Sequence, residues 1–330
     1  MTAVSAARGS VADTELGFTL MHEHIFVLSP EVAQNWPETF GDEQQRIADA
    51  VAALNRAKAA GVDTIVDLTV IGAGRYIPRI QRVAAQTPVN IVVATGVYTW
   101  NDLPFFFGLV GPGALLDGPE SMDDFFVRDI EEGIGATGVR AGILKCATDT
   151  AGLTYGVERV LRSVARAHRR TGAPISTHTD GVRTGALQQQ IFDSEGVDLS
   201  GVVIGHVDRT PDLDADAVER LVSRGSVAGF DTFGLTLTVT DEHRLDVIAQ
   251  LCARGYADRI VVSHDHASYL DWLYVGGGYD AVPVSKNGYT HICESAVPGL
   301  RARGVHEEHI TQITIGNPAR ILGSIGRGGY

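Results

Sequence analysis

Short apolar runs of four or five residues recur along the whole chain, and the stretches between them carry apolar residues three or four positions apart. Runs of this length that are rich in β-branched residues predict buried strands, whereas the wider spacing predicts amphipathic helices. The eight predicted strands cover Phe18–Met21, Thr64–Leu68, Asn90–Ala94, Ala141–Lys145, Pro174–Thr177, Val202–Gly205, Ser226–Phe230 and Arg259–Ser263.

The clearest helical patterns begin near Asp42, follow Gly156, and cover Val218–Ser223 and Leu245–Ala253. Such alternation is typical of parallel strands joined by crossover helices. Eight units of this kind predict an α/β fold, a distorted (β/α)8 barrel of the TIM type, formed as one domain by residues 1–330. An open doubly wound sheet is the competing architecture, but no G-x-G-x-x-G fingerprint follows an early strand.

Two long irregular stretches, Asn101–Met122 and Ala267–Tyr289, follow the third and eighth predicted strands. The loops after barrel strands build the active-site face, so we expect both stretches to lie over it. Their glycine, proline and aromatic residues suit an apolar substrate pocket.

Charge and cysteine content exclude several classes of protein. The chain has 27 basic and 40 acidic residues, a net charge of −13, and no basic run, so binding to nucleic acid or to an anionic membrane is not expected. No apolar stretch is long enough to predict a membrane span. The polar start of the chain is unlike a signal peptide. Cys146, Cys252 and Cys293 lie far apart and predict no disulfide framework, consistent with a cytoplasmic protein.

Residues that bind metals recur at the ends of the predicted strands. His22 and His24 lie two positions apart after an apolar run, so in a strand their imidazoles share one face. His178, His206 and Asp265 each follow another apolar run. A single histidine after a strand is usually structural, but catalytic groups of barrels come from these strand ends. The recurrence therefore predicts a metal site at the barrel mouth.

Lys145 ends the fourth predicted strand, where it would point into the same mouth. A buried site disfavours the charged form of lysine. Two interpretations remain open. The lysine forms a salt bridge, or its neutral amine reacts with carbon dioxide to give a carbamate that can bridge two cations.

Several segments resemble the phosphotriesterase family of the amidohydrolase superfamily, and within it the phosphotriesterase-like lactonases. The matching segments occur in the family's order and span nearly the whole chain. They are Thr19–His24, Gly142–Ala147, Ile175–Thr179, Val203–His206, Val262–Asp265 and Asn317–Arg320.

The resemblance implies two divalent metal ions at the C-terminal mouth of the barrel. The implied ligands are His22, His24 and Asp265 for one metal and His178 and His206 for the other, with carbamylated Lys145 and a hydroxide ion as bridges. Zinc is the first expectation, and cobalt, iron and manganese accept the same ligands. Asp265 would take the hydroxide proton and pass it to the leaving alkoxide. The family tendency implies a homodimer.

Tyr98 matches a tyrosine that lactonases place over the metals, where its hydroxyl would orient the hydroxide or the lactone ring. The alternative is a tyrosine that only packs at a strand end. Trp272 resembles an aromatic residue of the family's last active-site loop, and it too could be simple packing.

Three departures from the lactonase pattern lie near the implied metals. Asp180 stands where lactonases have a histidine, Arg209 stands at a carboxylate position, and Thr232 stands at an arginine position. One interpretation gives Arg209 a catalytic place, because it restores the positive charge missing at Thr232. The other pairs Arg209 with Asp208 or Asp212 in solvent.

These features predict a binuclear metal-dependent hydrolase that opens lactones by attack of a metal-bridging hydroxide. N-acyl-homoserine lactones, the signals removed in quorum quenching, are candidates. Phosphotriester hydrolysis is the alternative, since the same site can polarise a P=O group. A degenerate family member that binds metal without turnover is a third reading. The expected partner is a small lactone or ester.

Overall fold

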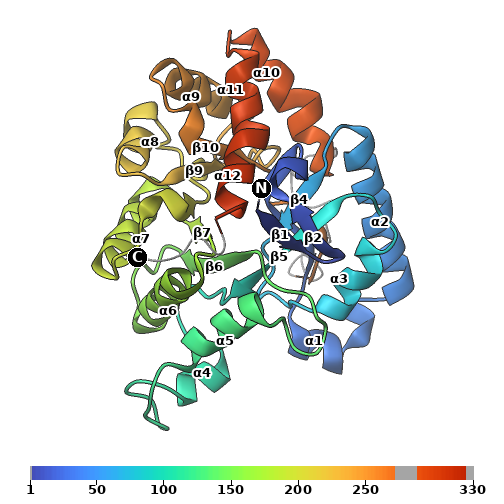
Figure 1. Ribbon diagram of the computed structural model, residues 1–330, viewed down its shortest axis with the longest axis vertical. Helices are drawn as coiled ribbons and strands as arrows, with labels where there is room; N and C mark the ends of the chain where they lie inside the picture. The colour runs from blue at the N-terminus through green and yellow to red at the C-terminus, as the bar shows by residue number, and fades with distance from the viewer. Residues whose placement is uncertain (1, 272–287, 325–330) are drawn as a thin grey trace.

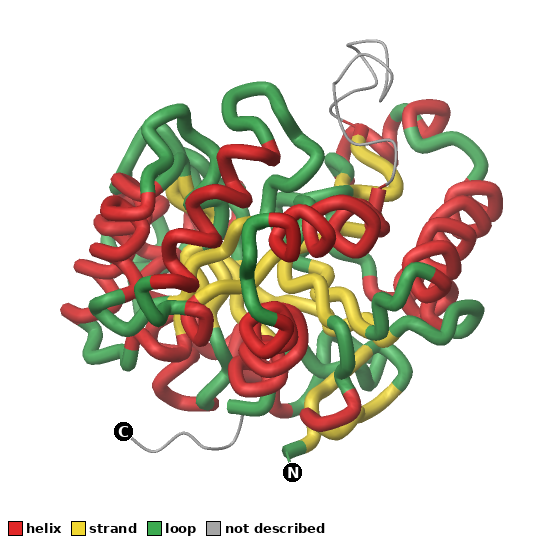
Figure 2. The backbone as a smooth tube through the Cα atoms, turned by 90° about the horizontal axis from the view of Figure 1, so that it is seen from above, coloured by secondary structure: helices red, strands yellow, loops and turns green. Residues whose placement is uncertain are grey.

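The computed structural model describes residues 2–271 and 288–324. A curled parallel sheet stands at the centre, and helices surround it (Figures 1 and 2). The strands follow the order β10-β9-β8-β7-β6-β5-β4-β3-β11. Their bounds are β3 (Thr19–Val27), β4 (Thr64–Asp67), β5 (Asn90–Gly96), β6 (Ile143–Thr148), β7 (Ile175–Thr179), β8 (Val202–Ile204), β9 (Val227–Phe230), β10 (Ile260–Val262) and β11 (Ala267–Leu270).

The two ends of this sheet meet, so it is a barrel. The Asp265 N–H donates to His22 O at 3.1 Å, and the His24 N–H donates to His266 O at 2.8 Å. β11 pairs with β3 in parallel, while β10 pairs with β9. β10 and β11 thus share the eighth strand position, interrupted by residues 263–266. The predicted distorted TIM-type barrel is confirmed, and all eight predicted strands are present.

Twelve α-helices lie within the described residues, most of them in the connections between strands. Their bounds are α1 (Pro30–Asn35), α2 (Glu43–Ala59), α3 (Ile77–Ala84), α4 (Phe105–Leu109), α5 (Ser121–Glu131), α6 (Tyr155–Thr171), α7 (Val182–Ser194), α8 (Ala215–Val222), α9 (Asp241–Ala253), α10 (Val297–Ala302), α11 (Glu307–Thr311) and α12 (Asn317–Leu322). The Asp42 carboxylate caps α2 by accepting from the Gln45 N–H, as expected for a helix beginning there. Among the described helices, none has the length and apolar character of a membrane span.

Side chains fill the interior of the barrel. They come from nearly every strand, and the larger ones are Met21, Val66, Leu68, Val92, Ile143, Val203, Val227 and Val261. Val4, Leu16 and Ile321 belong to the same buried cluster. The N-terminal hairpin, β1 (Ala3–Ala6) with β2 (Gly9–Ala12), and α12 therefore close the end of the barrel where the strands begin (Figure 1).

Candidate metal centre

β3 presents the two histidines of the His22-Glu23-His24 segment to the barrel mouth. Relative to β4, this strand carries one extra residue, because Leu20 pairs with Ile65 but Glu23 pairs with Asp67. A bulge of this kind re-aims side chains and is common next to active sites. The rings of His22 and His24 lie 5.8 Å apart.

The other predicted residues meet these histidines from separate strands. Lys145 Nζ on β6 lies 2.9 Å from His22 Nε2. The Asp265 carboxylate lies 3.2 Å from His24 Nε2 and 3.7 Å from His206 Nε2. The candidate ligand atoms of His22, His206 and Asp265 are all within 4.8 Å of one another. This spacing suits a cation between them.

His178, on β7, completes the group. Its ring lies 4.6 Å from the ring of His206 and 5.3 Å from the ring of Tyr98. The Tyr98 hydroxyl is 3.5 Å from His178 Nδ1. The structure thus brings together all six predicted metal ligands and Tyr98.

One buried carboxylate, Asp231, orients two of these histidines. It lies 2.7 Å from His22 Nδ1 and 2.6 Å from His206 Nδ1, and it accepts from the His206 N–H at 2.8 Å. Both Nε2 atoms are left facing the centre. A Cβ atom on Gly205 would lie 2.9 Å from Asp231 Oδ2 and 2.2 Å from Thr177 O, so glycine is required for this approach.

The remaining two histidines have similar outer partners. Asp149 Oδ2 lies 2.7 Å from His178 Nε2, and Thr69 Oγ1 lies 2.8 Å from His24 Nδ1. Metal-binding histidines almost always give their second nitrogen to such a partner, which fixes the tautomer and the ring orientation. All four histidines follow this pattern, so the donor set fits a divalent metal centre.

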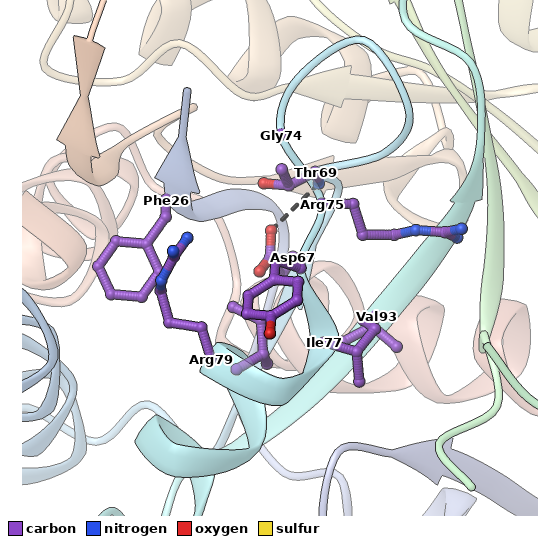
Figure 3. Close-up of a pocket in the computed structure, with 10 residues that line it drawn as sticks. Phe26, Asp67, Thr69, Gly74, Arg75, Ile77, Arg79 and Val93 are labelled. Atoms are coloured by element: carbon purple, nitrogen blue, oxygen red, sulfur yellow. Dashed lines mark hydrogen bonds between the residues drawn. The ribbon is translucent and has the colours of Figure 1, made fainter. Parts of the chain in front are cut away.

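Asp67 holds Thr69, the residue whose hydroxyl contacts His24. Its carboxylate accepts from the Thr69 N–H at 3.1 Å, inside a small pocket that Arg75 and Arg79 also line (Figure 3). Burial raises the pKa of Asp67, although the nearby His24 opposes this. Thr69 is therefore held on both its backbone and its side chain.

At His22, His178 and Asp265, the titration properties of the metal-free site favour the forms that bind metals. His206 differs, because burial lowers its pKa but Asp231 and Asp265 outweigh the effect of burial and raise it. Burial, reinforced by the Lys145 charge, lowers the pKa of His22 to about 4, and burial beside His206 lowers that of His178 to about 3. Burial raises the pKa of Asp265, but His206, His24 and His22 outweigh it and hold the pKa well below its usual range. Neutral imidazole and ionised carboxylate are the ligating species.

Backbone strain is concentrated at two of these residues. Among the described residues other than glycine, positive φ angles occur at His206, with 58°, and at Asp265, with 53°. Such conformations cost on the order of 1–3 kcal/mol each and persist only where the surroundings enforce them, often at functional sites.

A pocket opens above the centre. Its floor includes His22, His24, His178 and Asp265, and its wall is formed by Val27, Ala73, Tyr98, Ala267 and Leu270. Tyr98, which follows β5 and precedes the first predicted loop, lines one side, and Ala267 and Leu270 of the second predicted loop line the other. Trp100, also before the first loop, stacks on His178.

One expectation about the first loop is wrong. Its aromatic residues were expected to line the pocket, but Phe105 and Phe106 on α4 are 81% and 53% exposed. Phe107 is buried in the core instead. Trp272 lies outside the described residues.

Arg209 lies at the centre rather than in solvent. Its Nη1 is 2.9 Å from His178 Nε2 and 3.4 Å from Asp149 Oδ2. The hydrogen bond from His178 holds the pKa of Asp149 below its usual range, and although burial opposes this, the Arg209 charge contributes to the lowering. Arg209 is thus a cation beside His178 and Asp149, and its charge helps to keep the Asp149 carboxylate ionised.

The cation beside Thr232 is a different arginine. Arg244 on α9 is buried, donates to Thr232 Oγ1 at 2.8 Å and donates to Asp208 Oδ2 at 2.8 Å. Asp208 in turn accepts from the backbone N–H groups of Asp231 and Thr232. The arginine at Thr232 is therefore Arg244, so the prediction that Arg209 restores the charge there is wrong. The predicted pairing of Arg209 with Asp208 or Asp212 is wrong as well, because Arg209 pairs with Asp149.

Sequence reasoning missed Asp149, Asp231 and Arg244. Asp149 directly follows β6 and Asp231 directly follows β9. The strand-end rule that selected the histidines could have found both carboxylates. Arg244 lies within a helix, and no local signal marks it.

Comparison with known proteins places this geometry in a family. The model of the phosphotriesterase family matches residues 2–322. The chain belongs to the phosphotriesterase family. It is 54% identical over 333 residues to the phosphotriesterase homology protein of Mycobacterium tuberculosis (strain ATCC 25618 / H37Rv), with 100% of each chain covered.

More distant relatives carry other names. The chain is 37% identical over 316 residues to the aryldialkylphosphatase of Saccharolobus solfataricus, covering 96% of this chain and 98% of the relative. It is 27% identical over 376 residues to the N-acetyltaurine hydrolase of Dictyostelium discoideum, covering 97% of each.

Among solved structures, the phosphotriesterase from Mycobacterium tuberculosis superimposes with a TM-score of 0.94 at 54% identity, covering 99% of this chain and 100% of that one. Together with the histidine and aspartate cluster, these relationships identify a metal-dependent hydrolase of the phosphotriesterase family.

Proposed function

We propose that this enzyme opens lactones at a binuclear metal centre. The observation that carries the proposal is the grouping of six candidate ligands, His22, His206 and Asp265 at its core with His24, His178 and Lys145 around them, beneath a pocket with an apolar wall. Val27, Ala73, Ala267 and Leu270 would receive a hydrocarbon chain, while the polar floor receives the ester group. N-acyl-homoserine lactones combine these two features.

Two divalent cations, zinc first among the candidates, would be held by the six ligands. His22, His24 and Asp265 would hold one, His178 and His206 the other, and Lys145 would serve both. When bound, such cations polarise the carbonyl oxygen and lower the pKa of water from ~15.7 towards 7.

Lys145 suits the bridging role as a carbamate. Burial lowers the pKa of its amine to about 8, so a substantial neutral fraction is present in mildly alkaline solution. The amine nitrogen forms a bond to the carbon of carbon dioxide and loses a proton. The product is a carboxylate in place of a cation, which removes the positive charge from the centre.

Asp265 is the proton carrier in this proposal. Its side chain is 29% exposed and lines the pocket, and its low pKa keeps it ionised at neutral pH. It accepts the proton of the attacking water and delivers it to the leaving alkoxide as the ring opens. Tyr98 stays protonated, because burial raises its pKa, and its hydroxyl orients the substrate.

Phosphotriester hydrolysis is the second candidate, favoured by the relationship to a protein named aryldialkylphosphatase. We further expect the enzyme to act as a homodimer in the cytoplasm on small lactones or esters.

The metal-loaded enzyme should be assayed with lactones of increasing acyl length and with paraoxon-type phosphotriesters. We expect kcat/KM to be highest for lactones and Asp265→Asn to reduce every activity. Turnover of phosphotriesters without any turnover of lactones would overturn the lactonase proposal in favour of the second candidate.

A further inference from the structure

Glu23, the residue between the two β3 histidines, has a fully buried carboxylate that contacts none of the candidate ligand side chains. It contacts the segment that interrupts the eighth strand position. Ser263 Oγ donates to Glu23 Oε1 at 2.7 Å, the His264 N–H donates at 3.0 Å, and His264 Nδ1 lies at 2.6 Å. The His266 N–H donates to Oε2 at 2.9 Å.

These contacts bracket Asp265. Glu23 holds the backbone N–H groups of the residues immediately before and after it, and the Asp265 N–H itself donates to His22 O. Asp265 is one of the two strained residues, with a φ of 53°. A non-glycine residue keeps this conformation only where neighbouring contacts enforce it. Glu23 provides three of its four contacts within one residue of Asp265.

His264 acts here as a neutral donor. The Ile292 N–H donates to His264 Nε2 at 2.9 Å, so that nitrogen carries a lone pair. The ring proton of the neutral imidazole then resides on Nδ1 and points at Glu23. All four groups around Glu23 are therefore hydrogen-bond donors, and a carboxylate accepts all four.

We propose that Glu23 is a positioning residue that fixes Asp265 in its strained conformation and so aims its carboxylate at the metal centre. This inference rests on the proposed function, in which Asp265 moves the proton. Glu23 also links the segment around Asp265 to His22, because Ser263 Oγ accepts from the His22 N–H at 2.9 Å while it donates to Glu23.

Glu23→Gln tests the proposal with a side chain of equal size. Whichever way the amide is turned, its NH2 group faces at least one of the four donors. Release of the strained conformation would lower kcat on the order of 10- to 100-fold per metal-loaded site, with KM little changed.

Glu120→Gln is the matched control. The side chain of Glu120 is only 6% exposed, and it accepts from Arg159 Nε at 2.8 Å and from the Met122 N–H at 3.3 Å, outside the metal centre. We expect this variant to lose stability without any change in kcat per loaded site.

Two readouts do not depend on turnover. Zinc retention against a chelator should fall at least ~10-fold in Glu23→Gln but not in Glu120→Gln. In the metal-free protein, the amides of His264 and His266 should lose protection from hydrogen exchange only in Glu23→Gln.

Wild-type kcat and zinc retention in a folded Glu23→Gln variant would overturn the proposal, as would equal losses in both glutamine variants. If Glu23→Gln does not fold, Ser263→Ala removes one donor to Glu23 together with the acceptor of the His22 N–H. It should lower zinc retention about 3- to 10-fold and also expose the His264 and His266 amides to exchange, and unchanged exchange at those amides would count against the proposal. A wild type that binds zinc but hydrolyses no ester would refute the proposed function, while zinc retention and exchange would still decide the role of Glu23.

Discussion

Replacing Asp231 with asparagine should weaken metal binding through a change of histidine tautomer. One carboxylate oxygen of Asp231 serves the N–H and Nδ1 of His206, and the other serves His22 Nδ1. An asparagine keeps one accepting oxygen, and it loses fewest hydrogen bonds if that oxygen stays with His206. The amide NH2 then faces His22 Nδ1, which must give up its proton. The proton moves to His22 Nε2, the atom that faces Lys145 and Asp265, and a protonated nitrogen cannot bind a metal.

Loss of such an outer partner typically weakens metal affinity 10- to 100-fold, which corresponds to ~1.4–2.7 kcal/mol. Competition between the protein and a zinc chelator would measure this change. Asp129→Asn is the control, because Asp129 is a buried carboxylate that accepts from Thr95 Oγ1 at 2.6 Å and from Arg75 at 2.9 Å, with no contact to the candidate ligands. A folded Asp231→Asn protein that retains zinc as tightly as the wild type would refute the reasoning.

Three further predictions follow from the site. Metal-free protein given zinc at a fixed concentration of dissolved carbon dioxide should recover activity faster as the pH rises through about 8, because burial lowers the pKa of Lys145 to that value and only the neutral amine reacts. A recovery independent of pH and of carbon dioxide would contradict the carbamate. Arg209→Ala should lower kcat/KM about 10-fold, more than Thr232→Ala, because Arg209 contacts His178 and Thr232 contacts Arg244 instead. Comparable losses of kcat/KM in the two variants would count against a role of Arg209 at the metal centre. Leu270→Ala should raise KM about 5-fold for long-chain lactones, because it removes apolar contact with the acyl chain that contributes ~1 kcal/mol to binding. The KM for short lactones should not change, and equal effects on both would exclude Leu270 from the chain-binding wall.

The barrel strands were predictable because each contains a short buried apolar run, often rich in β-branched residues, as in Asn90–Gly96. The N-terminal hairpin was not, because Ala3–Ala6 and Gly9–Ala12 consist mostly of small residues that show no clear alternation. β11 (Ala267–Leu270) was assigned to a loop, because it is short and polar residues precede it. It is recognised as a strand from its parallel pairing with β3. Local patterns identify elements that are apolar by themselves and miss those that depend on a partner.

The same distinction holds for the site. Parallel strands end at one rim, so residues such as His178 and His206 could be grouped from their positions after strands. The pairing of Arg244 with Asp208 joins residues 36 positions apart and depends on how α9 packs against the barrel. The clamp of Glu23 on residues 263–266 likewise spans about 240 positions. Neither pairing leaves a periodic signal in the sequence.

Anomalous diffraction from crystals of the zinc-loaded protein tests the central claim most directly. We expect two strong peaks among His22, His24, Lys145, His178, His206 and Asp265, with continuous density extending from Lys145 Nζ towards both. Absence of any peak within this group of residues in fully loaded crystals would contradict the assignment of the site.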